Sequence, residues 1–429
     1  MNIINSFDSF LMEAQKFPHV ADWNSKQRHK EELVKSGLPT RKQESWRNTS
    51  LKFLSENDFK PASHSPTQLP DGVLALASSK MIDGCHTLVF LNGFYMSGLS
   101  RFDVNTVFIN ENTKKDSSFQ GDVDSVSIHH LNEIYNLNPI DITIKSDLTQ
   151  PLQILNLTHL MDGLPLAISP KVNVTVKSNK EAKIVLSHVG EHQARYFTNG
   201  MFTFAIEKEA RVELVNHINQ STNAYHFDFV GITVETSATV RYFELNLNAQ
   251  LTRHEFVLEL NGEHIQAEVL GASYLKQNQH CDSQTYINHH KGSCHTEQVY
   301  KALLDDESRS VFSGTVFIAE GIAKTDSAQL NQNLLLSDKV EVNSKPILRI
   351  FSDDVKASHG STMGKIQEDE IFYLQSRSIS RPKAIELLGQ GFLNEIVLRM
   401  GSDVLKRHFS KELLNELGMQ RKAKLKVVK

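Results

Sequence analysis

Apolar and polar residues alternate along the middle of the chain, from about residue 87 to residue 350. The runs are short, as in KVNVTV from residue 171 and TVRYFELNL from residue 239, and they are rich in Val, Ile, Phe, Thr and Tyr. This pattern predicts β-strands. Short polar turns separate the runs, and no long helical pattern interrupts them. The order excludes the alternating strands and helices of a doubly wound α/β sheet.

A weak repeat runs through these predicted strands. A small residue followed two positions later by a β-branched residue recurs at residues 182–184, 210–212 and 238–240, in two steps of 28 residues. A unit of this length is too small to bury its own apolar face, so the repeat predicts a stacked solenoid such as a parallel β-helix. A β-sandwich is the alternative architecture for the same strands.

The N-terminal part of the chain has a helical pattern instead. From Asn5 to about Phe59, apolar residues recur at intervals of three and four, and Gly37 and Pro39 stop the second run. A polar stretch that contains Pro and Ser follows over residues 60–72 and is typical of a linker. We therefore predict an N-terminal helical domain and linker over residues 1–72.

The helical pattern returns after His359. Ser380 precedes Pro382 and is the expected start of a helix with one apolar stripe. The stripe consists of Ile385, Leu388, Phe392 and Ile396. A further amphipathic helix is predicted from residue 402, and the basic end is expected to be a solvated tail. We therefore predict a β-strand core over residues 73–358 and a C-terminal helical domain over residues 359–429.

Composition and charge argue against some classes of partner. With a net charge of −4 over 429 residues, the protein has no general electrostatic attraction to nucleic acid or to anionic membranes. Cys85, Cys281 and Cys294 form neither a disulfide framework nor a CxxC pair, which indicates a reducing compartment. The N-terminus lacks the pattern of an export signal, and no window reaches the roughly 20 apolar residues that span a bilayer. We expect a cytoplasmic protein.

One segment superficially resembles a phosphate-binding loop. Residues 360–365 read GSTMGK, but a P-loop needs four residues between its glycines and a Ser or Thr after the lysine. Here three residues intervene and Ile366 follows Lys365. The spacing argues against nucleotide hydrolysis by this chain.

Two other segments contain candidate metal ligands. His289, His290, Cys294 and His295 lie within seven residues, and imidazole and thiolate suit zinc or iron. Alternation along a strand sends His289 and His290 to opposite faces, so the four side chains could converge on one ion only around a tight turn. Cys294 is therefore a weak candidate ligand. In the second segment, residues 353–364, we expect an exposed polar turn in which His359 is a candidate ligand.

The run from Lys324 to Ile396 carries a family resemblance. Its elements NLLLSD, VNSKP, DDVKASHG and FYLQSRSI stand in the order and spacing of the SufB/SufD family of iron–sulfur cluster assembly proteins. GLPTRKQESWRNTSL at residues 37–51 and the Cys294 segment running into QVYKALLDD are further matches. The resemblance covers nearly the whole chain, and its length, few cysteines and long N-terminal helical stretch are more similar to the SufD branch than to SufB.

The resemblance implies a fold and a set of partners. The fold would be mainly β, with a central right-handed parallel β-helix flanked by N-terminal and C-terminal α-helical parts. The chain would be a non-catalytic subunit of the SufBCD complex, pairing with SufB through the β-helix and docking the SufC ATPase through its C-terminal helices. When isolated it would form a homodimer.

The same resemblance implies site residues and cofactors. The family histidine corresponds to His359, a candidate cluster ligand at the SufB interface, whereas the cysteine that is common two residues earlier is Ala357 here. For SufC binding we expect a surface formed by Glu370, Phe372, Tyr373, Leu374 and Arg377. The complex would carry a transient Fe–S cluster, with reduced flavin as a further candidate, and the isolated chain would hold no tightly bound cofactor.

Two alternative functions have different requirements. A SufB-like homodimeric scaffold would need a self-complementary edge on the β-helix. A β-helix carbohydrate-active enzyme would need a carboxylate or calcium constellation on one exposed face, and the acidic residues show no repeated ladder of this kind.

Overall fold

The computed structural model describes residues 7, 10, 12, 23–63, 69, 72–111, 125–160 and 163–427, with side chains up to residue 418. Most of the first predicted helical run and part of the predicted linker lie outside these residues.

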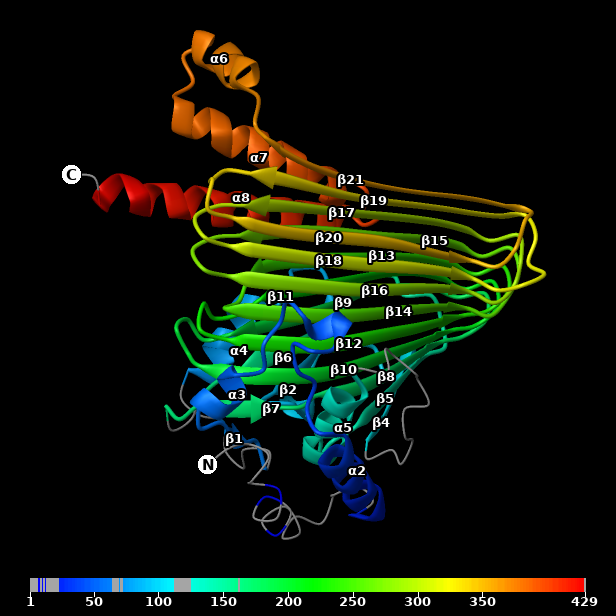
Figure 1. Cartoon of the computed structure of the whole chain (residues 1–429). Helices are drawn as coiled ribbons and strands as arrows, with labels where there is room; N and C mark the ends of the chain where they lie inside the picture. The colour runs from blue at the N-terminus through cyan, green and yellow to red at the C-terminus, as the bar shows by residue number, and fades with distance from the viewer. Residues whose placement is uncertain are drawn as a thin grey trace.

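The centre of the molecule is a solenoid of two stacked sheets (Figure 1). From β8 onwards, consecutive strands alternate between the sheets, so each turn adds one strand to each. Sheet A contains β1 (Lys60–Pro61), β4 (Val107–Glu111), β5 (Ile140–Ile144), β7 (Leu166–Ile168), β8 (Lys171–Val176), β10 (Tyr196–Ile206), β12 (Tyr225–Val234), β14 (Leu251–Leu260), β16 (His280–His289), β18 (Arg309–Ile318) and β20 (Glu341–Ile350). Sheet B contains β2 (His86–Leu91), β3 (Phe94–Tyr95), β6 (Leu152–Thr158), β9 (Glu181–Gly190), β11 (Arg211–Asn219), β13 (Thr239–Asn248), β15 (Gln266–Leu275), β17 (His295–Leu304), β19 (Thr325–Leu335) and β21 (Val355–Lys365).

The pairing between successive turns is parallel, which confirms the predicted solenoid and excludes the antiparallel β-sandwich. Val212 pairs with Val240, as the 28-residue step predicts. Ala182 pairs with Val212 rather than Ala210, so the first step of the predicted repeat is two residues too short. The strand pairing depends on which side chains stack inside the solenoid, and the sequence motif does not fix that.

Alternate side chains of each strand point into the space between the sheets, here called the lumen. In-register pairing stacks them in columns along the solenoid. One buried column consists of Val174, Phe204, Ile232, Leu258 and Ile287. Along this column the lumen is therefore filled by packed apolar side chains.

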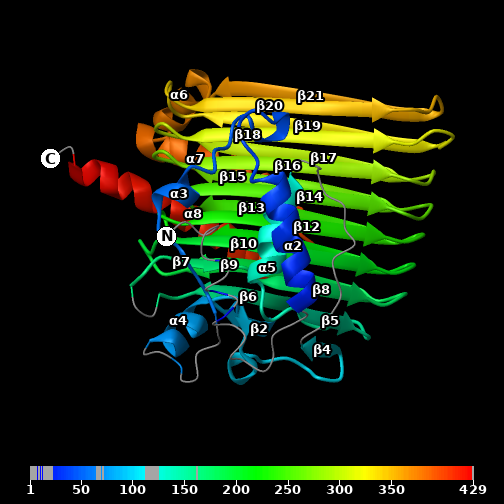
Figure 2. The same ribbon diagram turned by 60° about the horizontal axis from the view of Figure 1, so that its bottom comes forward.

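N-terminal helices cover the outer face of sheet A. Figure 2 shows α2 (Trp23–Ser36) and α5 (Val126–Tyr135) side by side across it. Lys26 Nζ joins them by donating hydrogen bonds to the carbonyls of Glu133 and Ile134, at 2.9 and 3.1 Å. The remaining elements of this part are η2 (Glu44–Trp46), α3 (Phe53–Glu56), α4 (Val73–Lys80) and η3 (Ser97–Leu99). Helices α4 and α5 lie within the residues that the sequence assigned to the strand core.

C-terminal helices follow the last strand. They are α6 (Glu368–Ser376), α7 (Arg381–Leu398) and α8 (Asp403–Val427). Ser380 precedes α7 in an extended conformation and Pro382 lies in its first turn, so the predicted start is confirmed. The buried stripe of α7 is Ala384, Gly389, Leu393, Ile396 and Val397, whereas three of the four predicted stripe residues are only half-buried.

Helices α7 and α8 pack against the outer face of sheet B, where Leu393 and Phe409 join a core with Phe243 and Leu303. Two predicted limits shift: β21 continues to Lys365, and α8 includes the predicted tail as far as Val427. Among the described residues, no helix is long and apolar enough to cross a membrane.

Candidate functional site at the open end of the solenoid

The solenoid ends on two uncovered strands. β20 is the last strand of sheet A and β21 the last strand of sheet B, and most of their residues are exposed or half-buried. Phe351 and Met363 are 60% and 59% exposed at this end. An edge strand offers unpaired backbone groups to a strand of another chain, and natural proteins usually protect such edges. The open end is therefore a candidate interface.

His359 lies on this end, in strand β21. It pairs in register with Gln329 of β19. The predicted polar turn at this position is wrong, because backbone pairing with β19 holds residues 355–365 extended; the turn is limited to residues just before Val355. Paired residues of parallel strands share a face, so His359 continues the lumenal column of Gln329 and is exposed because no strand covers it.

Ala357 occupies the neighbouring position on the same face of β21. It is half-buried and pairs with Ser327, which is 1% exposed. The side chain that replaces the family cysteine thus lies at the same open end as His359, and it offers no ligand atom there.

The adjacent histidines His289 and His290 of the other candidate segment point apart, as predicted. His289 is fully buried, with Nε2 3.2 Å from the Thr296 hydroxyl. His290 is exposed, and its Nε2 lies 2.5 Å from a carboxylate oxygen of Glu259. These two imidazoles do not converge on one ion.

Cys294 is separate from both. It is 1% exposed, and its Sγ lies 3.4 Å from the carbonyl oxygen of Gly262. His295 is exposed and pairs with Asp326 at 3.7 Å. The segment therefore does not assemble into one ligand set.

The thiols are poorly suited to bind a metal as they stand. Burial raises the pKa of Cys281 to about 12 and that of Cys85 to about 12, and it also raises the pKa of Cys294. The thiolate is the form that binds metals. All three cysteines are thus held in the protonated state at neutral pH.

Residues 360–365, which resemble a phosphate-binding loop, form the end of β21. The segment is extended, and Lys365 forms an ion pair with Asp338. A P-loop instead wraps its backbone amides around phosphate at the start of a helix.

The predicted SufC-binding residues lie on α6 and just after it. Phe372 and Tyr373 are 72% and 56% exposed, and Glu370 is also exposed. The Arg377 guanidinium lies 4.8 Å from the Tyr373 ring centroid, whereas Leu374 is half-buried. Figure 1 shows α6 standing clear of both sheets. Two exposed aromatic side chains beside charged residues are typical of a protein-binding surface.

Charged contacts connect α6 through α7 to sheet B. Arg381 of α7 forms a bidentate pair with Glu368 of α6, at 2.6 and 2.7 Å. At the other end of α7, Arg399 contacts Glu268 of β15 at 2.6 Å and Glu297 of β17 at 2.5 Å. The hydrogen bond with Glu297 makes the largest contribution to the raised pKa of Arg399. These contacts link α6 to α7 and α7 to strands β15 and β17 of sheet B.

A groove of about 780 Å³ lies on the outer face of sheet A beside the open end. It is bounded by residues 44–48 and by side chains of β16, β18 and β20, including Lys345 and Arg349. Glu44 forms an ion pair with Lys345 across it. The motif at residues 37–51 thus contributes directly to the surface next to β20.

Sequence reasoning missed a buried polar cluster deeper in the lumen. Nδ1 of His254, on β14, donates a hydrogen bond to the Asp228 carboxylate at 2.6 Å, and Nε2 lies 2.7 Å from the Tyr242 hydroxyl and 3.4 Å from Glu244. Burial lowers the pKa of His254, but Asp228 and Glu244 outweigh it and raise that pKa to about 9. The available signal was a polar residue at an inward position of an alternating strand, as in YHFDF from residue 225.

A family match extends from before β7 into α7. Residues 159–392 match the model described as "SUF system FeS cluster assembly, SufBD core domain", which covers more than half of the chain. The chain belongs to the SufB/SufD family. The matched residues include the open end, His359 and all of α6.

Individual SufB/SufD relatives extend the similarity to nearly the whole chain. This chain is 30% identical to "Iron-sulfur cluster assembly protein SufD" of Escherichia coli, over 89% of its own length and 90% of that protein. It is 29% identical to an "Iron-sulfur cluster assembly SufBD family protein" of Synechocystis, over 84% and 83% of the two chains. A third relative, 28% identical over 54% of this chain and 50% of its own length, is "Protein ABCI7, chloroplastic" of Arabidopsis thaliana. The predicted family is confirmed, and within it the chain is most like SufD.

Proposed function

We propose that this protein is a SufD-like, non-catalytic subunit of a cytoplasmic SufBCD complex that assembles iron–sulfur clusters. The open end of the solenoid carries the proposal. Strands β20 and β21 present two adjacent edges to solvent in a chain whose relatives are named as cluster assembly proteins.

SufB is the proposed occupant of this open end. A second solenoid of the same family has matching strand spacing, so its last strands can extend both sheets across a pseudo-twofold axis. Phe351 and Met363 would be buried by the same contact. A second copy of this chain is the alternative occupant in the absence of SufB, so the isolated chain would form a homodimer.

SufC is the proposed partner of α6. Phe372 and Tyr373 supply exposed anchors, and α7 connects them to β15 and β17 through Arg399. Closure of two ATPase subunits can bias an interface only through rigid elements that touch it. The path from α6 through α7 to sheet B supplies such an element.

The iron–sulfur cluster is cargo in this scheme. His359 offers one imidazole at the SufB-facing end, and a SufB thiolate would supply the soft ligand that Ala357 does not. The three cysteines of this chain are held protonated by burial and would not contribute. Flavin, if it takes part, would bind to the assembled complex.

Co-purification tests the proposed partners. The chain is tagged and co-expressed with SufB and SufC, as wild type and as the double variant Phe351→Asp with Met363→Asp. Two buried charges at the interface should remove SufB while SufC remains bound through α6. Val104→Asp is the matched control, because Val104 is 72% exposed and lies beside β4, the opposite end strand of sheet A. Retention of SufB by the double variant would contradict the proposed interface.

A non-catalytic role also predicts that the purified chain does not hydrolyse ATP. Residues 360–365 lack P-loop spacing and are extended in β21. Phosphate release is measured after complete removal of SufC, with Lys365→Ala as the comparison. Turnover that persists without SufC and disappears in the Lys365 variant would refute the non-catalytic assignment.

A further inference from the structure

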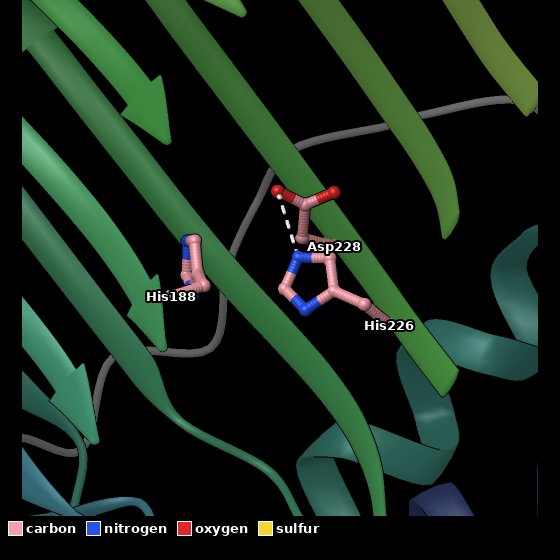
Figure 3. Close-up of side chains that lie close together, drawn as sticks. All are labelled: His188, His226 and Asp228. Atoms are coloured by element: carbon pink, nitrogen blue, oxygen red, sulfur yellow. Dashed lines mark ion pairs between the residues drawn. The ribbon is translucent and has the colours of Figure 1, made fainter. Parts of the chain in front are cut away.

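Three buried side chains meet inside the solenoid, away from the open end. His188 projects from β9 of sheet B, and His226 and Asp228 project from β12 of sheet A. Figure 3 shows His188 facing the other two across the lumen. The side chains of His226 and Asp228 are 0% exposed, and His188 is also 0% exposed. The two sheets thus bring together two imidazoles and a carboxylate that are far apart in sequence.

Their geometry is close to that of a ligand set. One nitrogen from each histidine and one Asp228 oxygen all lie within 4.8 Å of one another. His226 Nε2 is 3.6 Å from Asp228 Oδ2. Ligand atoms about 2.0–2.2 Å from a tetrahedral ion are separated by about 3.3–3.5 Å, so small side-chain rotations would complete the set.

Several polar atoms around this point have no hydrogen-bond partner among the residues that the structure describes. They are both ring nitrogens of His188, Oδ1 of Asn216 and both amide atoms of Asn156, and Nε2 of His226 has only the 3.6 Å ion pair with Asp228. Asn156 is the register partner of His188 on the adjacent strand β6. Each buried unpaired polar atom costs about 1–3 kcal/mol, and buried groups of this kind normally have a partner. A cluster of them indicates a bound ligand that supplies their interactions.

Neighbouring side chains already orient the three residues. Asp228 Oδ1 lies 2.6 Å from His254 Nδ1, and Asn216 Nδ2 donates to Asp228 Oδ2 at 2.7 Å. Gln220 contacts His226 Nδ1 at 2.7 Å, and its own Oε1 is buried without a partner. Turning that amide over would let Oε1 accept a hydrogen bond from Nδ1–H, leaving the lone pair of Nε2 free. Metal-bound histidines typically use this type of outer hydrogen bond.

We propose that His188, His226 and Asp228 form a lumenal binding site for one divalent first-row transition-metal ion. Two imidazole nitrogens and one carboxylate oxygen favour ions such as Zn²⁺, Fe²⁺ or Co²⁺ over Mg²⁺ and Ca²⁺, which prefer all-oxygen sites. The site is distinct from the cluster-holding role proposed for His359 on β21, and it belongs to this chain alone.

The test uses the isolated full chain and three ions, Co²⁺, Zn²⁺ and, under anaerobic conditions, Fe²⁺. Each ion is offered to the folded protein and also during refolding, because a closed lumen can slow entry. Bound metal is measured by elemental analysis, and Co²⁺ coordination by its visible absorption. We expect one equivalent per chain, a tetrahedral-type Co²⁺ spectrum and a higher Tm with metal.

Variants locate the ion. His188→Phe and Asp228→Asn should each weaken binding at least tenfold and change the Co²⁺ spectrum. His289→Gln is the matched control, since His289 is also a fully buried lumenal histidine but stands apart from the cluster. Circular dichroism establishes that each variant is folded.

Absence of binding by the wild type under both loading conditions overturns the proposal and assigns the unpaired atoms to buried water. Wild-type binding that folded His188 and Asp228 variants retain also overturns it. Neither result bears on SufB or SufC binding, which is measured separately.

Discussion

The Cζ atom of Arg253 lies 3.7 Å from the ring centroid of Trp46, and Trp46 is 1% exposed. Arg253 projects outward from β14 and also contacts Asp282 of β16 at 2.5 Å. Thr49 donates a hydrogen bond to the same carboxylate. The motif at residues 37–51 is thereby fixed to the outer face of sheet A, where it borders the groove beside β20.

Replacing Arg253 by Met should therefore destabilise the protein. The change removes the cation–π contact with Trp46 and leaves the buried carboxylate of Asp282 without its cationic partner, at a cost of about 3–5 kcal/mol. Urea denaturation measures the loss, and limited proteolysis should show earlier cleavage near residues 37–51. Arg195→Ala is the control, because its hydrogen bond to Asn57 is exposed. Equal stability of the Arg253 variant and the wild type would show that the contacts of Arg253 with Trp46 and Asp282 do not stabilise the fold.

The contacts of Glu412 should make the packing of α8 against sheet B less stable as the pH falls. It lies 3.2 Å from His217 of β11 and accepts a hydrogen bond from Asn219 at 2.8 Å. Burial alone would raise the pKa of Glu412, but His217 and these hydrogen bonds lower it to about 2. Because the folded-state pKa is below the unfolded value of 4.5, the stabilisation is complete above about pH 4.5 and is lost as the pH falls toward 2.

Glu412→Gln tests this dependence. The wild type should exceed the variant by about 2 kcal/mol at pH 7, and the difference should shrink at pH 4 and below. Thermal unfolding at pH 7, 5, 4 and 3 measures it. Ser410→Ala on the same helix removes a neutral hydrogen bond to Asn394, so its effect should not change with pH. A Glu412 difference that stays constant down to pH 3 would rule out the carboxylate as its source.

The α6 surface predicts a selective loss of SufC. Phe372→Ala combined with Tyr373→Ala removes both exposed aromatic side chains, each of which can contribute about 2 kcal/mol at the centre of an interface. Calorimetric titration with SufC should show weaker binding, whereas SufB pairing should be unchanged. Leu374, also predicted from the sequence, is a poorer target because it is half-buried. As a control, Leu398→Ala removes an exposed apolar residue on α7, 61% exposed, and SufC affinity should remain normal. Undiminished SufC affinity in the aromatic variant would move the contact elsewhere.

His359→Ala should impair cluster assembly without unfolding the protein. The side chain is exposed on the edge strand and contributes little to the core, so Tm and complex formation should stay near wild type. Cluster maturation, measured by iron and sulfide content and by complementation in cells, should fall. Ala357→Cys should be tolerated, since residue 357 is only half-buried beside Ser327. Full cluster assembly by the His359 variant would limit this residue to a structural role.

The sequence predicts the fold well where one physical pattern dominates. Alternation across residues 171–318 shows the strands, and the 28-residue step between Val212 and Val240 shows their stacking. The prediction from alternation fails at β21, because this polar edge strand exposes both faces and shows no alternation of apolar and polar residues. The extended conformation of β21 depends on its pairing with β19. The periodicity of α7 also predicts the wrong stripe, because only Ile396 of the four predicted residues is buried and the buried face depends on how the helix docks on sheet B.

The candidate site divides in the same way. Exposed anchors such as Phe372 and Tyr373 can be recognised from local sequence, and motif spacing identifies His359. The lumenal cluster cannot be found in this way, because His188 and Asp228 are 40 residues apart and meet only when two sheets close on one another. A polar residue at an inward position shows that something unusual is buried, but the fold decides what it faces.

The in-register stacking of the strands has a consequence for how the chain folds as it is made. Each new turn finds its template in the turn completed about 30 residues earlier, so growth needs only nearest-neighbour contacts and leaves one uncovered edge that moves forward with synthesis. Helices α7 and α8 are made after all the strands, yet they pack back on β13, β15 and β17. Until these two helices are made, the outer face of sheet B exposes Phe243 and Leu303. The nascent protein is therefore prone to aggregation between the synthesis of β21 and that of α7 and α8, and a truncation before residue 381 would preserve that state.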